Sequence, residues 1–414
     1  MRQEQLAAED DAREVAPGVV RIQLPILLPG LGHVNCYVLE DDRGVTLVDP
    51  GLPGPDAHAE LTRRLTRAGI PAKRVHTVLV THSHPDHFGG AGRLKAEQHC
   101  DVVAHHEFRT PFDQGDLAID DDLSELVDVT GRPAAPDRSG MLAEVLFGEG
   151  ELPEIPGRRT PWGGEGMRPS EAELEHMRSW DTLSKQGLLS LTPTVRVEDE
   201  QVITLGRDEW IVVHTPGHTG DHICLFDPVH GTLLSGDHVL PTITPHISGM
   251  TPDSDALASF FAALHRVAEI PGVANVLPAH GLPFDDLAGR VDQIIEHHED
   301  RLSLLAQIAL DLDDAPVEDY SRRMFRDRSW GPMAESETYA HLEHLRQEEM
   351  DRYQKRATPA ESKLLDEATK TLMQKVLKQH VLHLKSACRR EEAGKLVELL
   401  GELFDLEAQP ESVE

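Results

Sequence analysis

The sequence predicts an α/β fold in which two β-sheets pack face to face and helices lie outside them. Two blocks of apolar, β-branched segments, at about 15–105 and 195–281, are each accompanied by helical patterns. Hydrophobic residues make up 39% of the chain and aromatic residues only 4%, so the core is expected to be mainly aliphatic. The length of 414 residues leaves room for one catalytic domain and accessory segments.

The first block predicts an antiparallel meander that continues into alternating helices and strands. Turn-forming residues at 29–30 and 40–42 separate the first strands. Strands are expected at 18–22, 35–39, 44–49, 75–80 and 101–105, and helices at 56–68 and 89–97. Residues 1–16 are polar and are expected to be disordered or loosely packed.

The second block predicts a further set of strands and is followed by a helical region. Strands are expected at 195–197, 201–205, 210–214, 222–226, 232–237 and 275–281, and helices at 254–268, 287–309 and 335–345. Between the two blocks, residues 106–194 are acidic and rich in Pro and Gly. Because an unstructured loop of that length is unusual in a compact domain, we expect a helical cap there.

The overall charge argues against nucleic acid and membrane partners. The formal net charge is -32, which disfavours nonspecific binding to polyanions. One stretch, 351–390, holds ten basic and four acidic residues, and we interpret it as a solvated helix face. The polar N-terminus does not resemble a signal peptide, and the four unpaired cysteines are typical of a reducing compartment, so a cytoplasmic location is expected.

A cluster of metal-binding side chains follows the strand predicted at 75–80. The sequence from Thr81 to His87 reads THSHPDH and runs into a pair of glycines. Since strand side chains alternate between two faces, these residues are expected on a loop at the strand's carboxyl end. Imidazole nitrogens and a carboxylate on one short loop are ligands that zinc and similar divalent metals prefer.

Further candidate ligands stand at the ends of other predicted strands. Each lies beside Gly or Pro, which allows the tight loops through which ligands converge. They are Asp49 in VDPG, His218 in HTPGHTGDH, Asp237 in SGDH and His280 in PAHG. Each of these histidines alone would more often be a hydrogen-bonded structural residue.

Taken together and in this order, the motifs resemble those of the metallo-β-lactamase-fold hydrolases over about residues 15–285. The resemblance implies a four-layer αββα sandwich. It also implies a first metal held by His82, His84 and His218, a second held by Asp86, His87 and His280, and Asp237 bridging the two, with Asp49 supporting the ligands from behind. The Asp86, His87 and Asp237 combination is similar to that of the glyoxalase II and ribonuclease Z branches, whereas the commonest zinc β-lactamases carry cysteine where Asp237 stands.

The resemblance also implies a domain plan. Residues 1–16 would be a polar N-terminal segment and 17–285 the catalytic domain, with 106–194 as a helical cap inserted in it. Residues 286–354 resemble a winged-helix-like helical module of one branch of the family, and 355–414 would be a helical tail. The branch includes an endoribonuclease as well as uncharacterised bacterial hydrolases.

The resemblance implies hydrolysis at two divalent ions, with Zn²⁺ the default and manganese or iron as alternatives. A hydroxide bridging ions about 3.5–4 Å apart would be the nucleophile. Asp86 and Asp237 would be the catalytic carboxylates, Asp86 orienting the hydroxide or passing a proton to the leaving group. His238 and His246 follow Asp237 in sequence and are candidates for substrate contact, with a structural role as the alternative for each.

The expected substrate is a small molecule with a thioester, ester or lactone bond. An endoribonuclease or other phosphodiesterase is the first alternative, which the C-terminal module favours and the net charge disfavours. A β-lactamase is the second alternative, and a binding protein on an inactive hydrolase fold is a third. A homodimer is compatible with the sequence, and no membrane partner is expected.

Overall fold

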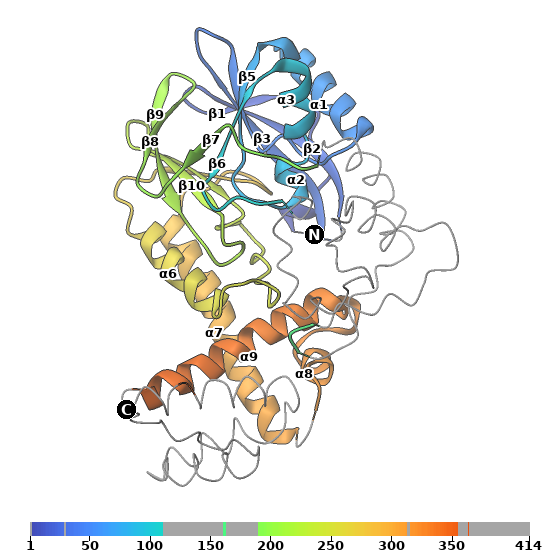
Figure 1. Ribbon diagram of the computed structural model, residues 1–414, viewed down its shortest axis with the longest axis vertical. Helices are drawn as coiled ribbons and strands as arrows, with labels where there is room; N and C mark the ends of the chain where they lie inside the picture. Colours follow the sequence, from blue (N-terminus) through green and yellow to red (C-terminus); the bar gives the residue numbers. More distant parts are fainter. Residues whose placement is uncertain are drawn as a thin grey trace, which may run out of the picture. The chain divides into compact units, whose positions relative to one another are not determined.

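The computed structural model describes residues 2–28, 30–110, 160–162, 189–312, 315–354 and 363 (Figure 1). The chain divides into two compact units. The first comprises Met1–Ile155, Pro169–Pro245 and Ala262–Gln293, and the second Pro156–Arg168, His246–Phe261 and Ile294–Glu414. Every helix in the described ranges is too short or too polar to cross a lipid bilayer.

The first unit contains a seven-stranded sheet whose strands follow one another in chain order. The strands are β1 (Arg13–Ala16), β2 (Val19–Leu28), β3 (Leu31–Glu40), β4 (Val45–Val48), β5 (Val75–Leu79), β6 (Asp101–His105) and β7 (Val195–Val197). β1 to β4 pair antiparallel, as the meander predicts, and β4 to β7 pair parallel. The carboxyl ends of β4 and β5 therefore lie at the same edge of the sheet.

A second, five-stranded sheet is formed by the later block of strands. It contains β8 (Val202–Leu205), β9 (Asp208–His214), β10 (Ile223–Asp227), β11 (Thr232–Gly236) and β12 (Asn275–Pro278) in the order β12-β11-β10-β9-β8. β11 and β12 pair parallel, and the other pairs are antiparallel. Here too a parallel pair brings two carboxyl ends to one edge.

The two sheets pack face to face, and alternation along the strands fills both sides of the first sheet. Val48 and Leu79 belong to the core shared with Trp210 and Leu225 of the second sheet. Their neighbours Leu47 and Val78 point to the opposite face, where helices cover them. Parallel strands buried on both faces are mainly apolar, and β4 and β5 are so apart from Thr46, His76 and Thr77. The observed architecture is a mixed α/β fold with two sheets and external helices, as predicted.

Helices cover the outer face of the first sheet. Leu61 and Leu65, one turn apart on α1 (Pro55–Arg67), and Leu94 on α3 (Ala91–Gln98) enter this core. Fully burying a leucine stabilises a fold by about 1.5–3 kcal/mol. α6 (Ala256–Ala268) reaches the second sheet through Arg266, whose guanidinium donates to the carbonyl oxygen of His214 at the end of β9.

The N-terminal segment is ordered, contrary to the expectation of loose packing. It forms η1 (Gln3–Gln5) and β1, and the side chain of Glu4 is fully buried. The Glu4 carboxylate accepts hydrogen bonds from the backbone N–H of Thr242, at 2.7 Å, and of Ile243, at 3.1 Å, and from the hydroxyl of Thr242. A buried acceptor with three donors fixes the segment, which composition alone did not reveal.

The second unit is helical in its described part. It contains most of α7 (Leu287–Asp311), with α8 (Val317–Met324), η4 (Asp327–Ser329) and α9 (Pro332–Gln354). Leu305 and Ile308 of α7, Tyr320 of α8 and Leu342 of α9 form its core with Trp162. Helix α9 extends well beyond the predicted 335–345. Most of the predicted cap and nearly all of the predicted tail lie outside the described residues, and the domain boundaries and the winged-helix-like module stay predictions.

Candidate metal centre

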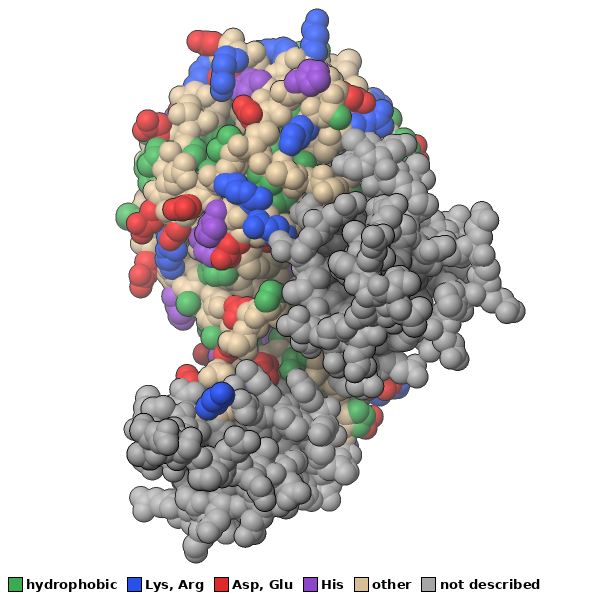
Figure 2. Space-filling view, viewed as in Figure 1, with side chains coloured by type: hydrophobic (Ala, Val, Ile, Leu, Met, Phe, Trp, Pro, Cys, Tyr) green, Lys and Arg blue, Asp and Glu red, His purple; other side chains and the backbone are tan. Residues whose placement is uncertain are grey.

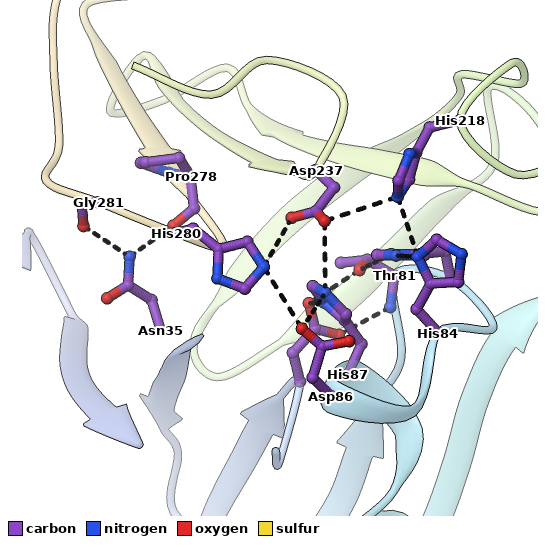
Figure 3. A network of polar contacts seen from close by, with 12 residues as sticks. Asn35, Thr81, His84, Asp86, His87, His218, Asp237, Pro278, His280 and Gly281 are labelled. Atoms are coloured by element: carbon purple, nitrogen blue, oxygen red, sulfur yellow. Dashed lines mark hydrogen bonds and ion pairs between the residues drawn. The ribbon is translucent and has the colours of Figure 1, made fainter. Parts of the chain in front are cut away.

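The structure brings the seven predicted metal ligands of the first unit together in two groups at one edge of the two sheets. Figure 3 labels all of them except His82. The ligands of the THSHPDH motif follow β5, and His218 lies in the connection from β9 to β10. Asp237 directly follows β11, and His280 comes two residues after β12. Four strand ends thus supply the site, which is the edge at which open α/β sheets place their ligands.

Three imidazoles form the first group. His84 Nδ1 lies 3.1 Å from Nε2 of His82 and 3.0 Å from Nε2 of His218. His218 Nε2 is also 3.6 Å from Oδ2 of Asp237. One ligand atom from each of these four residues falls within 4.8 Å of the others.

Asp86, His87 and His280 form the second group, which Asp237 also contacts. His280 Nε2 lies 3.5 Å from Oδ2 of Asp86 and 3.2 Å from Oδ1 of Asp237. His87 Nε2 is 3.6 Å from Oδ2 of Asp86 and 3.6 Å from Oδ2 of Asp237. The Asp237 carboxylate therefore stands between the two groups.

The second half of the motif is helical, which corrects the prediction of a loop that leads into a helix near Gly89. A short helix, α2 (Pro85–Phe88), begins at Pro85, and α3 starts only after Gly90. Proline is favoured at the first helical position because its fixed φ suits the helix and its missing N–H has no partner there. Asp86 and His87 therefore sit on a helical turn, and their side chains leave the backbone in different directions from those of His82 and His84.

Asp49 organises the ligands from behind. Its Oδ1 accepts from the backbone N–H of Thr81 at 2.9 Å, and its Oδ2 accepts from the Thr81 hydroxyl at 2.8 Å and from His87 Nδ1 at 2.9 Å. Asp49 has a positive φ of 56°, which few non-glycine residues adopt. This left-handed backbone conformation turns the chain sharply after β4, so that the Asp49 carboxylate points at the THSHPDH motif.

The outer hydrogen bonds fix which nitrogen of each ring faces the site. His87 Nδ1–H donates to Asp49, and His280 Nδ1–H donates to the carbonyl oxygen of His33 at 2.6 Å. Since the Thr81 hydroxyl already donates to Asp49, it accepts from Nδ1–H of His82, at 3.1 Å. With Nδ1 engaged on the outer side, the Nε2 atoms of all three rings face inward and would present lone pairs to a bound cation, the arrangement that metal-binding histidines have.

The electrostatics of the two groups differ. Burial, together with the neighbouring His87 and His84, lowers the pKa of His82 well below its ordinary value. Burial alone would do the same to His87, but the carboxylates of Asp86, Asp237 and Asp49 raise its pKa well above the ordinary value. In the absence of a metal, the second group thus holds a proton that a cation would displace.

The residues fit a divalent metal. His87 Nε2, His280 Nε2 and Asp237 Oδ1 are buried and have ion-pair contacts but no hydrogen-bond partner. Buried polar atoms in proteins normally have partners, and a cation between these groups would supply one. A donor set of imidazole nitrogens and carboxylate oxygens suits zinc and related ions.

Sequence reasoning missed several residues that hold the ligands. His222 accepts from the backbone N–H of Asp237, with 3.0 Å between its Nε2 and that nitrogen, and its Nδ1 lies 2.7 Å from the Thr215 hydroxyl. Asn35 donates to the carbonyl oxygens of Pro278 at 2.7 Å and Gly281 at 2.9 Å, which fixes the loop that carries His280. His222 belongs to the HTPGHTGDH motif, so its place in the sequence indicated a role at the site. No feature of the sequence around Asn35 indicated one.

The two residues predicted to contact substrate belong to different compact units. His238 is fully buried, and its ring centroid is 5.9 Å from that of His222. This burial favours the structural alternative, and burial also lowers its pKa to about 3. His246 belongs to the second unit, where its Nδ1 lies 3.5 Å from Oε2 of Glu337.

Comparisons with known proteins agree with this geometry. The sequence model of the metallo-beta-lactamase superfamily matches residues 29–307. A probable metallo-hydrolase, YqjP, from Bacillus subtilis is 24% identical over 347 residues, which cover 80% of this chain and 93% of that protein. A hydroxyacylglutathione hydrolase from Rhodopseudomonas palustris is 31% identical over 135 residues, 27% of this chain and 51% of that protein.

The C-terminal region matches a different family. The model of the glutamyl-tRNA(Glu) reductase dimerisation domain matches residues 321–406, which include most of the predicted helical tail, 355–414. A glutamyl-tRNA reductase from Cytophaga hutchinsonii is 32% identical over 150 residues. The match spans 36% of this chain and only 32% of that protein's length.

Solved structures share the fold. A metallo-beta-lactamase family protein from Thermus thermophilus has a TM-score of 0.58 at 24% identity, covering 81% of this chain and 95% of its own. A beta-lactamase domain protein from Burkholderia ambifaria has a TM-score of 0.56 at 26% identity, covering 82% and 90%. Fold, ligand constellation and a family match over more than half of the sequence agree, and the chain belongs to the metallo-beta-lactamase superfamily of metal-dependent hydrolases.

Proposed function

We propose that this protein is a binuclear hydrolase that cleaves a thioester, ester or lactone bond in a small molecule. His82, His84 and His218 would hold one Zn²⁺, and Asp86, His87 and His280 a second. The observation that carries the proposal is the position of Asp237, whose carboxylate lies within 3.6 Å of Nε2 of His218, His87 and His280. A single carboxylate in contact with two ligand groups suits a bridging role.

Metal ions bound there would lower the pKa of a shared water and polarise the scissile carbonyl. The chain's own residues supply the rest. Asp86 is 5% exposed and lies beside both His87 and His280, where its carboxylate could orient the attacking water and carry a proton to the leaving group. Asp49 keeps His87 in the tautomer that binds, so its part is positioning.

The choice of substrate class rests on the ligand set and on charge. The partial match to a hydroxyacylglutathione hydrolase supports a thioester or related ester. The net charge of -32 disfavours RNA. On the face seen in Figure 2, acidic and basic side chains are interspersed over the described residues.

The test combines metal analysis with a substrate panel. Purified protein is assayed for zinc content and for cleavage of thioester, lactone, lactam and RNA substrates. His84→Ala and Asp237→Ala are expected to lose metal and to reduce kcat/KM by about 10³-fold or more, because several kcal/mol of transition-state stabilisation depend on the metals. His58→Ala, which removes a histidine paired with Glu97 elsewhere in the first unit, is the matched control.

Two outcomes would reject the proposal. Wild-type activity in either ligand variant would exclude the two-metal mechanism. RNA cleavage that falls steeply between low and moderate salt, with no thioester or lactone turnover, would favour the endoribonuclease alternative, since only polyanion binding has that salt dependence.

We also propose that the chain forms a homodimer through its C-terminal region. The support is the match of residues 321–406 to a family described as a dimerisation domain. Light scattering of the full chain is expected to give twice the protomer mass of 45.8 kDa. A monomer at all concentrations tested would refute this second proposal without affecting the first.

The cytoplasmic location expected from the sequence belongs to the same set of proposals. Cys36, Cys100 and Cys224 are buried free thiols, which is typical of proteins in a reducing compartment. Cell fractionation of the source organism with an antibody against the chain tests it.

A further inference from the structure

A second cluster of metal-binding side chains lies in the helical unit, outside the hydrolase centre. His298 comes from α7, and Glu337 and His341 come from α9. All three side chains are buried, and neither histidine has any exposed surface. Glu337 and His341 are four residues apart and therefore share one face of α9.

The ligand atoms of the cluster converge. His298 Nδ1 lies 3.0 Å from Nε2 of His341. One nitrogen or oxygen from each of the three residues falls within 4.8 Å of the other two. A carboxylate and an imidazole on one helix, facing an imidazole on a neighbouring helix, is a pattern by which helix bundles hold metals in their cores.

The orientation of His341 is fixed by its own helix. Its Nδ1 is 2.7 Å from the carbonyl oxygen of Glu337, which can only accept, so Nδ1 carries the proton and Nε2 presents a lone pair to His298. Metal-binding histidines are commonly held by such a backbone contact. Burial lowers the pKa of His341 to about 4 and that of His298 to about 2, so both rings are neutral near pH 7.

Glu337 connects the cluster to a further histidine and to an arginine. Its Oε2 lies 3.5 Å from Nδ1 of His246, and its Oε1 forms an ion pair with Arg301. Burial alone would raise the pKa of Glu337, but the arginine outweighs burial and holds that pKa well below its ordinary range, so the carboxylate stays ionised. One oxygen thus serves Arg301, and the other lies on the side of His246.

Apolar rings border the cluster. Phe260 and Phe261 pack edge to face against the His298 ring, with centroids 5.7 Å and 6.0 Å away. His298 Nδ1 is the ring nitrogen that faces His341, so it is the atom of His298 that would bind an ion. Apolar surroundings that keep water out strengthen the attraction between a bound cation and the Glu337 carboxylate.

We propose that His298, Glu337 and His341 bind one divalent transition-metal ion, by preference Zn²⁺. Two imidazole nitrogens and one carboxylate oxygen are ligands that zinc prefers. Because all three ligands are buried where α7 contacts α9, this ion stabilises the packing of the two helices and takes no part in hydrolysis.

The experiment counts zinc in the full-length protein at a free Zn²⁺ concentration fixed by a metal buffer. His341→Gln and Glu337→Gln remove ligands while nearly conserving volume, and His344→Gln is the matched control. His344 lies on the same helix and is similarly buried, but its Nδ1 contacts Asp255, 3.0 Å away, instead of the cluster. Wild type and His344→Gln are expected to hold one more zinc per chain than either ligand variant.

Circular dichroism establishes whether each variant is folded. If His341→Gln does not fold, Glu337→Gln still tests the proposal. Zinc is also expected to raise the thermal unfolding temperature of His344→Gln more than that of Glu337→Gln. Equal zinc content in wild type and a folded ligand variant would overturn the proposal. Because the result is a difference between chains that share the hydrolase centre, it stands whether or not that centre holds two metals.

Discussion

Asp49→Asn is the most informative single substitution near the hydrolase centre. The change keeps the size of the side chain but replaces one carboxylate oxygen by an NH₂ group. Asp49 accepts three hydrogen bonds from donors on Thr81 and His87. In either orientation of the asparagine, at least one of those donors faces another donor. With NH₂ toward His87, the imidazole must move its proton from Nδ1 to Nε2, which is the atom that binds the metal.

The size of the effect follows from these contacts. A hydrogen bond to a charged group contributes about 1.5–3 kcal/mol, and one such bond to His87 is lost or reversed. Outer-shell substitutions of this kind typically weaken metal binding by about 10–100-fold. We therefore expect zinc to bind to the Asp86, His87 and His280 group about 10–100-fold more weakly, with a smaller change at the other group.

Competition with a chromophoric chelator measures the two zinc affinities separately. Asp41→Asn is the matched control, because Asp41 also pairs with a histidine, at 3.1 Å from Nε2 of His76, but lies outside the centre. Thermal unfolding in excess zinc establishes that both variants are folded. Unchanged affinity of both zinc ions in Asp49→Asn would refute the inference that Asp49 sets the tautomer of His87.

Three further predictions concern the same unit. Asp86→Asn is expected to weaken binding of the second metal and to lower kcat more than it raises KM. Steady-state kinetics at saturating zinc can measure both constants, and an effect on KM alone would contradict the role given to Asp86. Carboxylates raise the pKa of His87 and His280 in the metal-free protein, so zinc must displace protons there. The zinc affinity should therefore fall with decreasing pH, by up to about tenfold per pH unit for each proton displaced. Calorimetry in buffers of different ionisation enthalpy would detect the proton release, and the absence of proton release would contradict the prediction. Glu4→Gln should lower the free energy of unfolding in urea by about 1.5–3 kcal/mol, because the buried carboxylate holds Thr242, and a change below about 0.5 kcal/mol would show that the N-terminal segment contributes little.

The local chemistry of the centre could be predicted from the sequence with little structural knowledge. The THSHPDH motif concentrates four predicted ligands on one short segment, and the strand before it is mainly apolar. Such signals are readable because they depend on neighbouring residues. The helical turn at Pro85 also had a local signal, since proline commonly begins a helix, but the adjacent glycines favoured a later start.

Features that depend on distant contacts could not be predicted. The N-terminal segment is polar, yet Glu4 is buried against Thr242 and Ile243. These two residues follow it in the sequence by 238 and 239 positions. His246 stands near Asp237 in sequence, but it belongs to the other compact unit and contacts Glu337 there. No periodicity or composition encodes these pairings, because each requires the chain to be folded first.

The sequence by itself determined the family and predicted which residues would bind metal, because residue type and spacing specify which donors are available. Only the tertiary structure decided how those donors are used. It put the Asp237 carboxylate between two ligand groups, and it fixed the tautomer of His280 through the carbonyl oxygen of His33, 247 residues away. Which nitrogen carries a proton depends on the partner that the fold brings to the other side of the ring, and that partner is not a neighbour in sequence.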